Sequence, residues 1–113
     1  MTRFVILEHD HPHPHHDLML EAGDVLWTWR LPHLPQTGDR MDAERVFDHR
    51  LVYLDYEGPV SGERGAVMRR EHGEFHWLKR DDTCLEVRID GIKLHAVLRL
   101  TREDGERWRL ECD

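Results

Sequence analysis

The chain has very little cysteine and no long hydrophobic segment, and both absences restrict what it can be. Its 113 residues include only two cysteines, Cys84 and Cys112, so a disulfide framework of the kind that stabilises small secreted domains is excluded. No apolar run approaches the roughly 20 residues that a membrane-spanning helix needs. The first residues also lack the hydrophobic stretch and cleavage site of a signal peptide. We therefore expect a cytoplasmic protein that does not associate with membranes.

Positive charge is also scarce. The chain carries 16 lysines and arginines against 23 aspartates and glutamates, a formal net charge of −7 at pH 7 with neutral histidines. This balance argues against a protein that coats nucleic acid through bulk electrostatics. It remains compatible with an enzyme that holds one phosphate locally, because a bound metal ion and a few arginines reverse the field inside a cleft. The length predicts a single domain over residues 1–113.

No segment keeps a long helical period, and β-strand patterns recur along the chain. Turn signals such as Gly, Pro and Asp-Gly separate short apolar or alternating segments, which is typical of an all-β sandwich or barrel. We expect a hairpin turn at His72-Gly73 and allow a short helix within residues 36–46. The predicted strands are residues 3–8, 15–21, 25–31, one or two strands in 43–56, 65–70, 74–78, 84–89, 92–101 and 107–112.

Metal-binding side chains are concentrated in residues 9–21. Five of the ten histidines lie at positions 9, 11, 13, 15 and 16, with Asp10 and Asp17 among them. Imidazole and carboxylate donors suit a borderline divalent ion such as Mn, Fe, Ni or Zn. His15 and Asp17 are two residues apart and share one face of a strand, and His9 would complete a set of two histidines and one carboxylate with open coordination positions. Other triples can be drawn from the same run, and such tracts also occur as surface loops that bind metal adventitiously.

A second pair of polar side chains, His49 and Tyr53, is four residues apart in a predicted strand and is expected to share a face. A histidine and a tyrosine placed together can bind an anionic oxygen and donate a proton to a leaving group. The competing interpretation is a surface histidine and a core tyrosine without a common role.

Taken together, these motifs resemble the 3′-phosphoesterase domain of the bacterial DNA ligase D proteins and its free-standing relatives. The resemblance covers essentially the whole chain. It is carried by His9, Asp10, His15, Asp17 and the Leu18–Glu21 run, by Trp29–Pro32, by Phe47–Gly58, and by the closing segments Lys93–Thr101 and Trp108–Leu110.

The resemblance implies a mainly all-β fold, a small single-domain β-barrel with at most short flanking helices. It also implies a manganese-type ion and the trimming of DNA 3′ ends during break repair by non-homologous end joining, first of a terminal ribonucleoside and then of the 3′-phosphate. Carried over by position, His9, His15 and Asp17 would be metal ligands, and His49 and Tyr53 would contact the scissile phosphate, with His49 as general acid. Mn is the expected ion, with Zn, Ni, Fe and Co as alternatives.

The chain departs from the family at Met19, where the family has an arginine that would clamp the phosphate. Three arginines on other segments, Arg30, Arg40 and Arg50, are candidates to supply this charge. The remaining carboxylates of the motif, Asp10 and Glu21, are expected to lie around the metal ligands and to orient the histidines by hydrogen bonding. The alternative for Glu21 is that it only closes its strand before the turn.

The sequence thus predicts a metal-dependent phosphoesterase that processes nucleic-acid 3′ ends, a hydrolase acting beside DNA ligase or polymerase repair proteins. The main alternative is a weakened or inactive family member that binds a divalent metal or a nucleic-acid end as a repair partner. A third is a metal-buffering protein that uses His11, His13 and His16 as well and therefore binds several ions.

Overall fold

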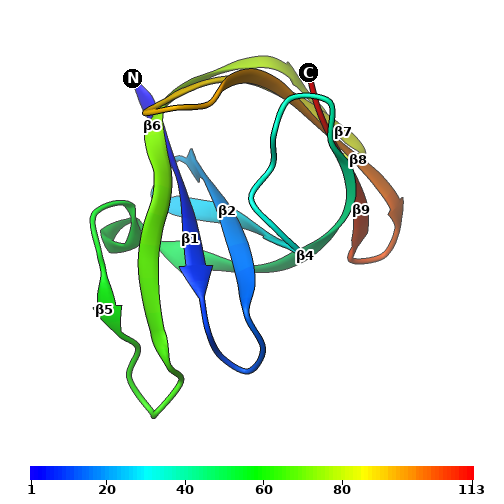
Figure 1. Ribbon diagram of the computed structural model, residues 1–113. Coiled ribbons are helices and arrows are strands. Elements are labelled where there is room, and N and C mark those ends of the chain that lie inside the picture. Colours follow the sequence, from blue (N-terminus) through cyan, green and yellow to red (C-terminus); the bar gives the residue numbers. More distant parts are fainter.

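Eight antiparallel strands close on themselves in the computed structural model, which describes residues 1–113 (Figure 1). Neighbouring strands follow the order β1-β2-β3-β4-β9-β8-β7-β6, and β1 pairs with β6 to complete the barrel, with the short β5 added beside β6. The strands are β1 (Thr2–His9), β2 (His15–Ala22), β3 (Val25–Leu31), β4 (Arg40–Arg50), β5 (Gly58–Pro59), β6 (Ala66–Arg80), β7 (Cys84–Gly91), β8 (His95–Asp104) and β9 (Arg107–Cys112). The predicted all-β barrel is confirmed.

The barrel interior is filled by the inward-facing half of each strand. Phe4 and Ile6 of β1 and Leu18 and Leu20 of β2 are all 1% exposed or less and belong to a cluster of 18 buried residues. Side chains alternate between the two faces of a strand, so the intervening residues point outward. This alternation places His15 and Asp17, which precede Leu18 at the beginning of β2, on the outer face.

A second, smaller core lies on the outer face of the barrel. It joins Val5 and Leu7 of β1, Met19 of β2, Leu26 of β3 and Val67 of β6, and it is covered by Leu54 of the 3-10 helix η1 (Leu51–Leu54). Strand β1 is therefore buried on both faces, as its continuous apolar run indicates. Because Leu54 packs in this core, η1 lies over the outer face of the barrel, and Tyr53 lies there with it.

Two expectations for the middle of the chain were wrong. The helix allowed within residues 36–46 is absent, because β4 begins at Arg40 and pairs with both β3 and β9, with Met41 and Ala43 turned inward. The strand expected to run to residue 56 ends at Arg50. Residues 51–54 form η1 instead, since this turn is what carries Leu54 into the small outer core. No helix in the structure is long and apolar enough to span a membrane.

The hairpin expected at His72-Gly73 was also wrong, because β6 continues without interruption through this point. Gly73 lies opposite Gly91 of β7, where a Cβ atom would be 2.1 Å from the Asp90 carbonyl oxygen. The glycine is thus required by the close approach of two strands and not by a turn. Strand β8 likewise begins at His95 and not at Ile92, because residues 92–94 form the connection held by the buried carboxylate of Glu71.

Candidate active site

The end of β1 and the beginning of β2 bring together His9, His15 and Asp17. His9 and His15 are direct cross-strand partners, and Asp17 follows on the same outer face. His15 Nε2 lies 3.4 Å and His9 Nδ1 lies 3.9 Å from Asp17 Oδ2. This is the one group in the chain in which three or more histidine, cysteine or acidic donors converge, with all donor atoms within 4.8 Å of one another. His15 and Asp17 are buried, 6% and 5% exposed.

Backbone carbonyls determine which ring nitrogen of each histidine faces the aspartate. His15 Nδ1 donates to the His13 carbonyl oxygen at 2.7 Å, and His9 Nε2 donates to the Arg64 carbonyl oxygen at 2.8 Å. The opposite nitrogen of each ring is left with its lone pair directed toward Asp17, an arrangement typical of metal-ligating histidines. The Asp17 carboxylate raises the pKa of His15 above its ordinary value, against desolvation by burial.

These donors fit a divalent transition-metal ion. His15 Nε2 and Asp17 Oδ1 are both buried without a hydrogen-bond partner, which is costly for a polar atom unless something else binds it. An ion about 2.1 Å from each of its ligands holds donor atoms roughly 3–4 Å apart, which matches the separations of Asp17 from both histidines. Two imidazoles and one carboxylate leave further coordination positions open.

His49 lies at the end of β4, and Thr28, which it contacts, is opposite Met19, two residues after Asp17 on β2. Burial lowers the pKa of His49 below its ordinary value, and the Asp17 carboxylate acts in the opposite direction. His49 Nδ1 donates to the Phe47 carbonyl oxygen at 3.0 Å and lies 2.9 Å from Thr28 Oγ1, while Nε2 has no partner within the protein. The ring is thus held from one side, and its free nitrogen is available to a ligand.

Tyr53 packs edge-on against His49, with ring centroids 5.6 Å apart. The two rings are therefore neighbours, but the expectation that they share a strand face was wrong. Tyr53 lies in η1 and not on a strand shared with His49, and the small outer core beneath it fixes its position.

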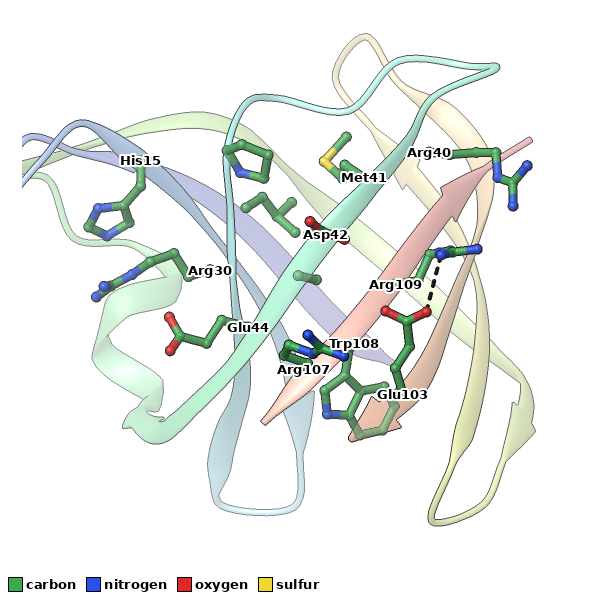
Figure 2. A pocket seen from close by; sticks show the side chains of 13 residues that line it. His15, Arg30, Arg40, Met41, Asp42, Glu44, Glu103, Arg107, Trp108 and Arg109 are labelled. Carbon is green, nitrogen blue, oxygen red and sulfur yellow. Dashed lines mark ion pairs between the residues drawn. The ribbon is translucent and has the colours of Figure 1, made fainter. Parts of the chain in front are cut away.

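The three candidate arginines occupy different places. Arg30 is directly opposite Asp17 on β2 and Glu44 on β4. Figure 2 shows Arg30 running beside His15, with Glu44 on its other side. The Nε atom of Arg30 is buried without a hydrogen-bond partner. The positive charge of Arg30 acts to lower the pKa of His15, against the larger effect of Asp17.

Arg40 lies farther along the same open groove of about 1140 Å³ and pairs with Glu111 at 3.5 Å. Arg50 is exposed at the end of β4, opposite Val25. Only Arg30 is therefore beside the cluster. The groove also contains acidic residues, so it is not a uniformly basic track; these are Asp42, Glu44 and Glu103.

The position expected for the phosphate clamp is occupied by an apolar contact. Met19 is 1% exposed and packs in the small outer core with Leu7 and Leu54. Met19 is opposite Thr28 on β3, and Arg30 is two residues farther along β3 on the same face. Of the three candidate arginines, the one beside the cluster thus comes from the neighbouring strand.

The two carboxylates expected to orient the histidines have other partners. Asp10 Oδ1 accepts a hydrogen bond from Ala66 N at 2.9 Å and ties the β1–β2 loop to the start of β6. Glu21 Oε1 accepts from Arg3 N at 2.8 Å, at the far end of β2. Neither carboxylate is hydrogen-bonded to a histidine of the cluster. The orienting groups that sequence reasoning missed are the carbonyls of His13 and Arg64, which no residue-type pattern reveals.

The other histidines of the run separate from the cluster. His11 and His13 are exposed on the loop. His16 points to the opposite face of β2, where it lies 3.8 Å from Glu8. Sequence reasoning also missed Phe47, which stacks on His49 and is 74% exposed. Its position two residues before His49 was the available signal, because such residues share a strand face.

Comparison with known proteins identifies the family of the chain. The model of the DNA ligase D 3′-phosphoesterase domain matches residues 7–102. The multifunctional non-homologous end joining DNA repair protein LigD of Mycobacterium tuberculosis is 35% identical over 93% of this chain, and LigD of Pseudomonas aeruginosa is 29% identical over 97%. The chain spans only 15% of the length of each of these relatives. The protein belongs to the DNA ligase D 3′-phosphoesterase domain family.

Proposed function

We propose that this protein is a metal-dependent phosphoesterase that processes the 3′ ends of nucleic acid during break repair by non-homologous end joining. The observation that carries the proposal is the group formed by His9, His15 and Asp17, in which two histidines of defined tautomer face one buried carboxylate. Membership of the 3′-phosphoesterase domain family supports the reaction class. The names of the relatives support the setting in end joining.

His9 Nδ1, His15 Nε2 and an Asp17 oxygen would hold the ion. Mn is the expected metal, and Zn, Ni, Fe and Co suit the same donors. When bound, a divalent ion of this type polarises a phosphoryl oxygen and lowers the pKa of water. The burial of Asp17 and His15 strengthens their electrostatic interactions with whatever occupies the site, because water is largely excluded there.

His49, Tyr53 and Arg30 would then surround the phosphate. His49 Nε2 is free to bind a phosphate oxygen and, in its protonated form, to donate a proton to the leaving oxygen. Tyr53 holds the His49 ring from one edge and offers a hydroxyl to the anion. Arg30, which is opposite Asp17, would offset the negative charge that develops on the phosphate.

The test is a primer–template that ends in a single 3′ ribonucleotide, incubated with Mn²⁺ and the wild-type protein. We expect removal of the terminal ribonucleoside, followed by loss of the 3′-phosphate, and neither product with His9→Ala. His13→Ala is the matched control, because His13 is exposed and contributes only its backbone carbonyl to the site. A wild-type protein that trims neither this end nor a simple phosphodiester would refute the enzymatic proposal.

The second candidate function is end binding without turnover, as a partner of DNA ligase or polymerase repair proteins. The observation that favours it is Met19, whose side chain fills an apolar contact where the family has an arginine. Measured binding of metal and of a DNA end, with no product, would select it. The metal-buffering alternative is less well supported, because His11 and His13 do not join the cluster.

A further inference from the structure

Phe47 is an exposed aromatic ring that belongs to a row of rings beside the candidate active site. Phe47 and His49 are two residues apart on β4, and their rings stack with centroids 4.7 Å apart and planes inclined by only 15°. His49 in turn contacts Tyr53, which contacts Tyr56 at 5.7 Å. Phe47 forms one end of this row and is its most exposed ring.

The outer face of Phe47 has no partner in the protein. The ring is 74% exposed although one of its faces is covered by His49, so the opposite face is in contact with solvent. An exposed Phe contributes little to folding, because burial of its apolar surface is what would stabilise the fold. Phe47 also takes no part in either hydrophobic core. Its position is thus not explained by packing.

The position of this ring relative to the cluster restricts what it can bind. His49 Nδ1 lies 2.9 Å from Thr28 Oγ1, and Thr28 is opposite Met19, which follows Asp17 by two residues on the outer face of β2. A phosphate bound at the cluster therefore lies near His49, the ring on which Phe47 stacks. A flat ring parallel to His49, open on its outer face and next to a phosphate site, matches a nucleotide, in which a planar base is linked to the phosphate through a sugar. Stacking of bases on aromatic side chains tolerates any base, because every base has a π-face.

We propose that Phe47 is a stacking platform for the nucleobase of the nucleotide at the 3′ end. The inference rests on the proposed function and adds a substrate class to it: a nucleotide that carries its base is preferred over a phosphoester that lacks one. Phe47 thereby acts as a specificity-determining residue. It does not touch the reacting phosphate.

The test uses a short single-stranded oligonucleotide that ends in a 2-aminopurine ribonucleotide, whose fluorescence is quenched when the base stacks. Binding is titrated without added metal, in a chelator. Trimming of 3′-ribonucleotide and 3′-abasic primers is then measured with Mn²⁺. The variants are Phe47→Ala, Phe47→Leu, which keeps apolar bulk without a π-face, and Phe47→Trp, which keeps the π-face. Ile92→Ala is the matched control, since Ile92 is 64% exposed on the β7–β8 connection.

We expect Phe47→Ala and Phe47→Leu to weaken binding of the base-bearing end, or to raise its KM, by about 5- to 150-fold. The abasic end should respond less than twofold, and Phe47→Trp and Ile92→Ala should behave as wild type toward both ends. Quenching or trimming that is indifferent to Phe47, or equal losses for both ends, would overturn this inference alone. A wild-type protein that neither quenches nor trims would overturn the proposed function together with it.

Discussion

The buried carboxylate of Glu71 is expected to be a major source of stability for the barrel. Glu71 is 3% exposed on β6, and its two oxygens accept four backbone hydrogen bonds. Oε1 accepts from His72 N at 3.1 Å and Ile92 N at 2.5 Å, and Oε2 accepts from Lys93 N at 3.0 Å and Leu94 N at 2.8 Å. One side chain of β6 therefore accepts hydrogen bonds from all three backbone N–H groups of the turn that connects β7 to β8.

The substitution Glu71→Gln tests this arrangement with almost no change in volume. The amide keeps one acceptor oxygen, but its NH₂ group faces the N–H groups of Lys93 and Leu94, so two hydrogen bonds to a charged acceptor are lost. At about 1.5–3 kcal/mol each, the free energy of unfolding should fall by about 3–6 kcal/mol. Urea unfolding at pH 7 measures the loss, and with an m-value of about 1–3 kcal/mol/M the midpoint should fall by at least ~1 M.

The pH dependence gives an independent measurement of the same group. Burial alone would raise the pKa of Glu71, but the four hydrogen bonds outweigh it and hold the pKa below its ordinary value of 4.5. The stabilisation is therefore fully present above the pKa of the unfolded chain, and it is lost as the pH falls through the lowered pKa of the folded state. The difference in the free energy of unfolding between wild type and Glu71→Gln should therefore become smaller as the pH falls through that range.

The control is Glu74→Gln on the same strand, where the side chain is exposed and makes no hydrogen bond. It should change the free energy of unfolding by less than about 0.5 kcal/mol. The reasoning is refuted if Glu71→Gln costs no more than this control, or if its cost stays constant as the pH falls.

Three further predictions concern the candidate active site. Mn²⁺ at a hundredfold excess over its dissociation constant should stabilise the wild type by about 2.7 kcal/mol in thermal unfolding. His9→Ala should abolish this stabilisation, and His13→Ala should not. Equilibrium dialysis that shows several ions per chain would contradict a single site. Arg30→Gln should lower kcat by about 10²–10³-fold while the chain still binds one metal ion. An effect confined to metal binding would show that Arg30 does not stabilise the charge on the phosphate. Met19→Arg should lower the free energy of unfolding in urea by about 3–5 kcal/mol, because it buries a charge in the small outer core. Met68→Arg, at a half-exposed position, should be tolerated. Equal stability of the two variants would show that the arginine at position 19 reaches solvent.

The sequence by itself determined the class of fold and the strand face on which His15 and Asp17 lie. Alternation of apolar and polar residues is a local, two-residue property, so the order of residues along the chain is enough to assign Leu18 and Leu20 to the interior and His15 and Asp17 to the opposite face. The same local signal failed where a tertiary contact overrides it. Gly73 is typical of a turn, but the approach of β7 requires it within a continuous strand.

Only the tertiary structure decided how the site is assembled around these donors. Closure of the barrel through β1 and β6 brings the Arg64 carbonyl to His9, 55 residues earlier in the chain, and so defines the tautomer of that histidine. The small outer core folds η1 over the sheet and brings Tyr53 to His49. The register between β2 and β3 places Arg30, and neither Arg40 nor Arg50, opposite Asp17. The contacts of His9 with Arg64 and of His49 with Tyr53 depend on how the whole barrel packs, so no local periodicity in the sequence predicts them.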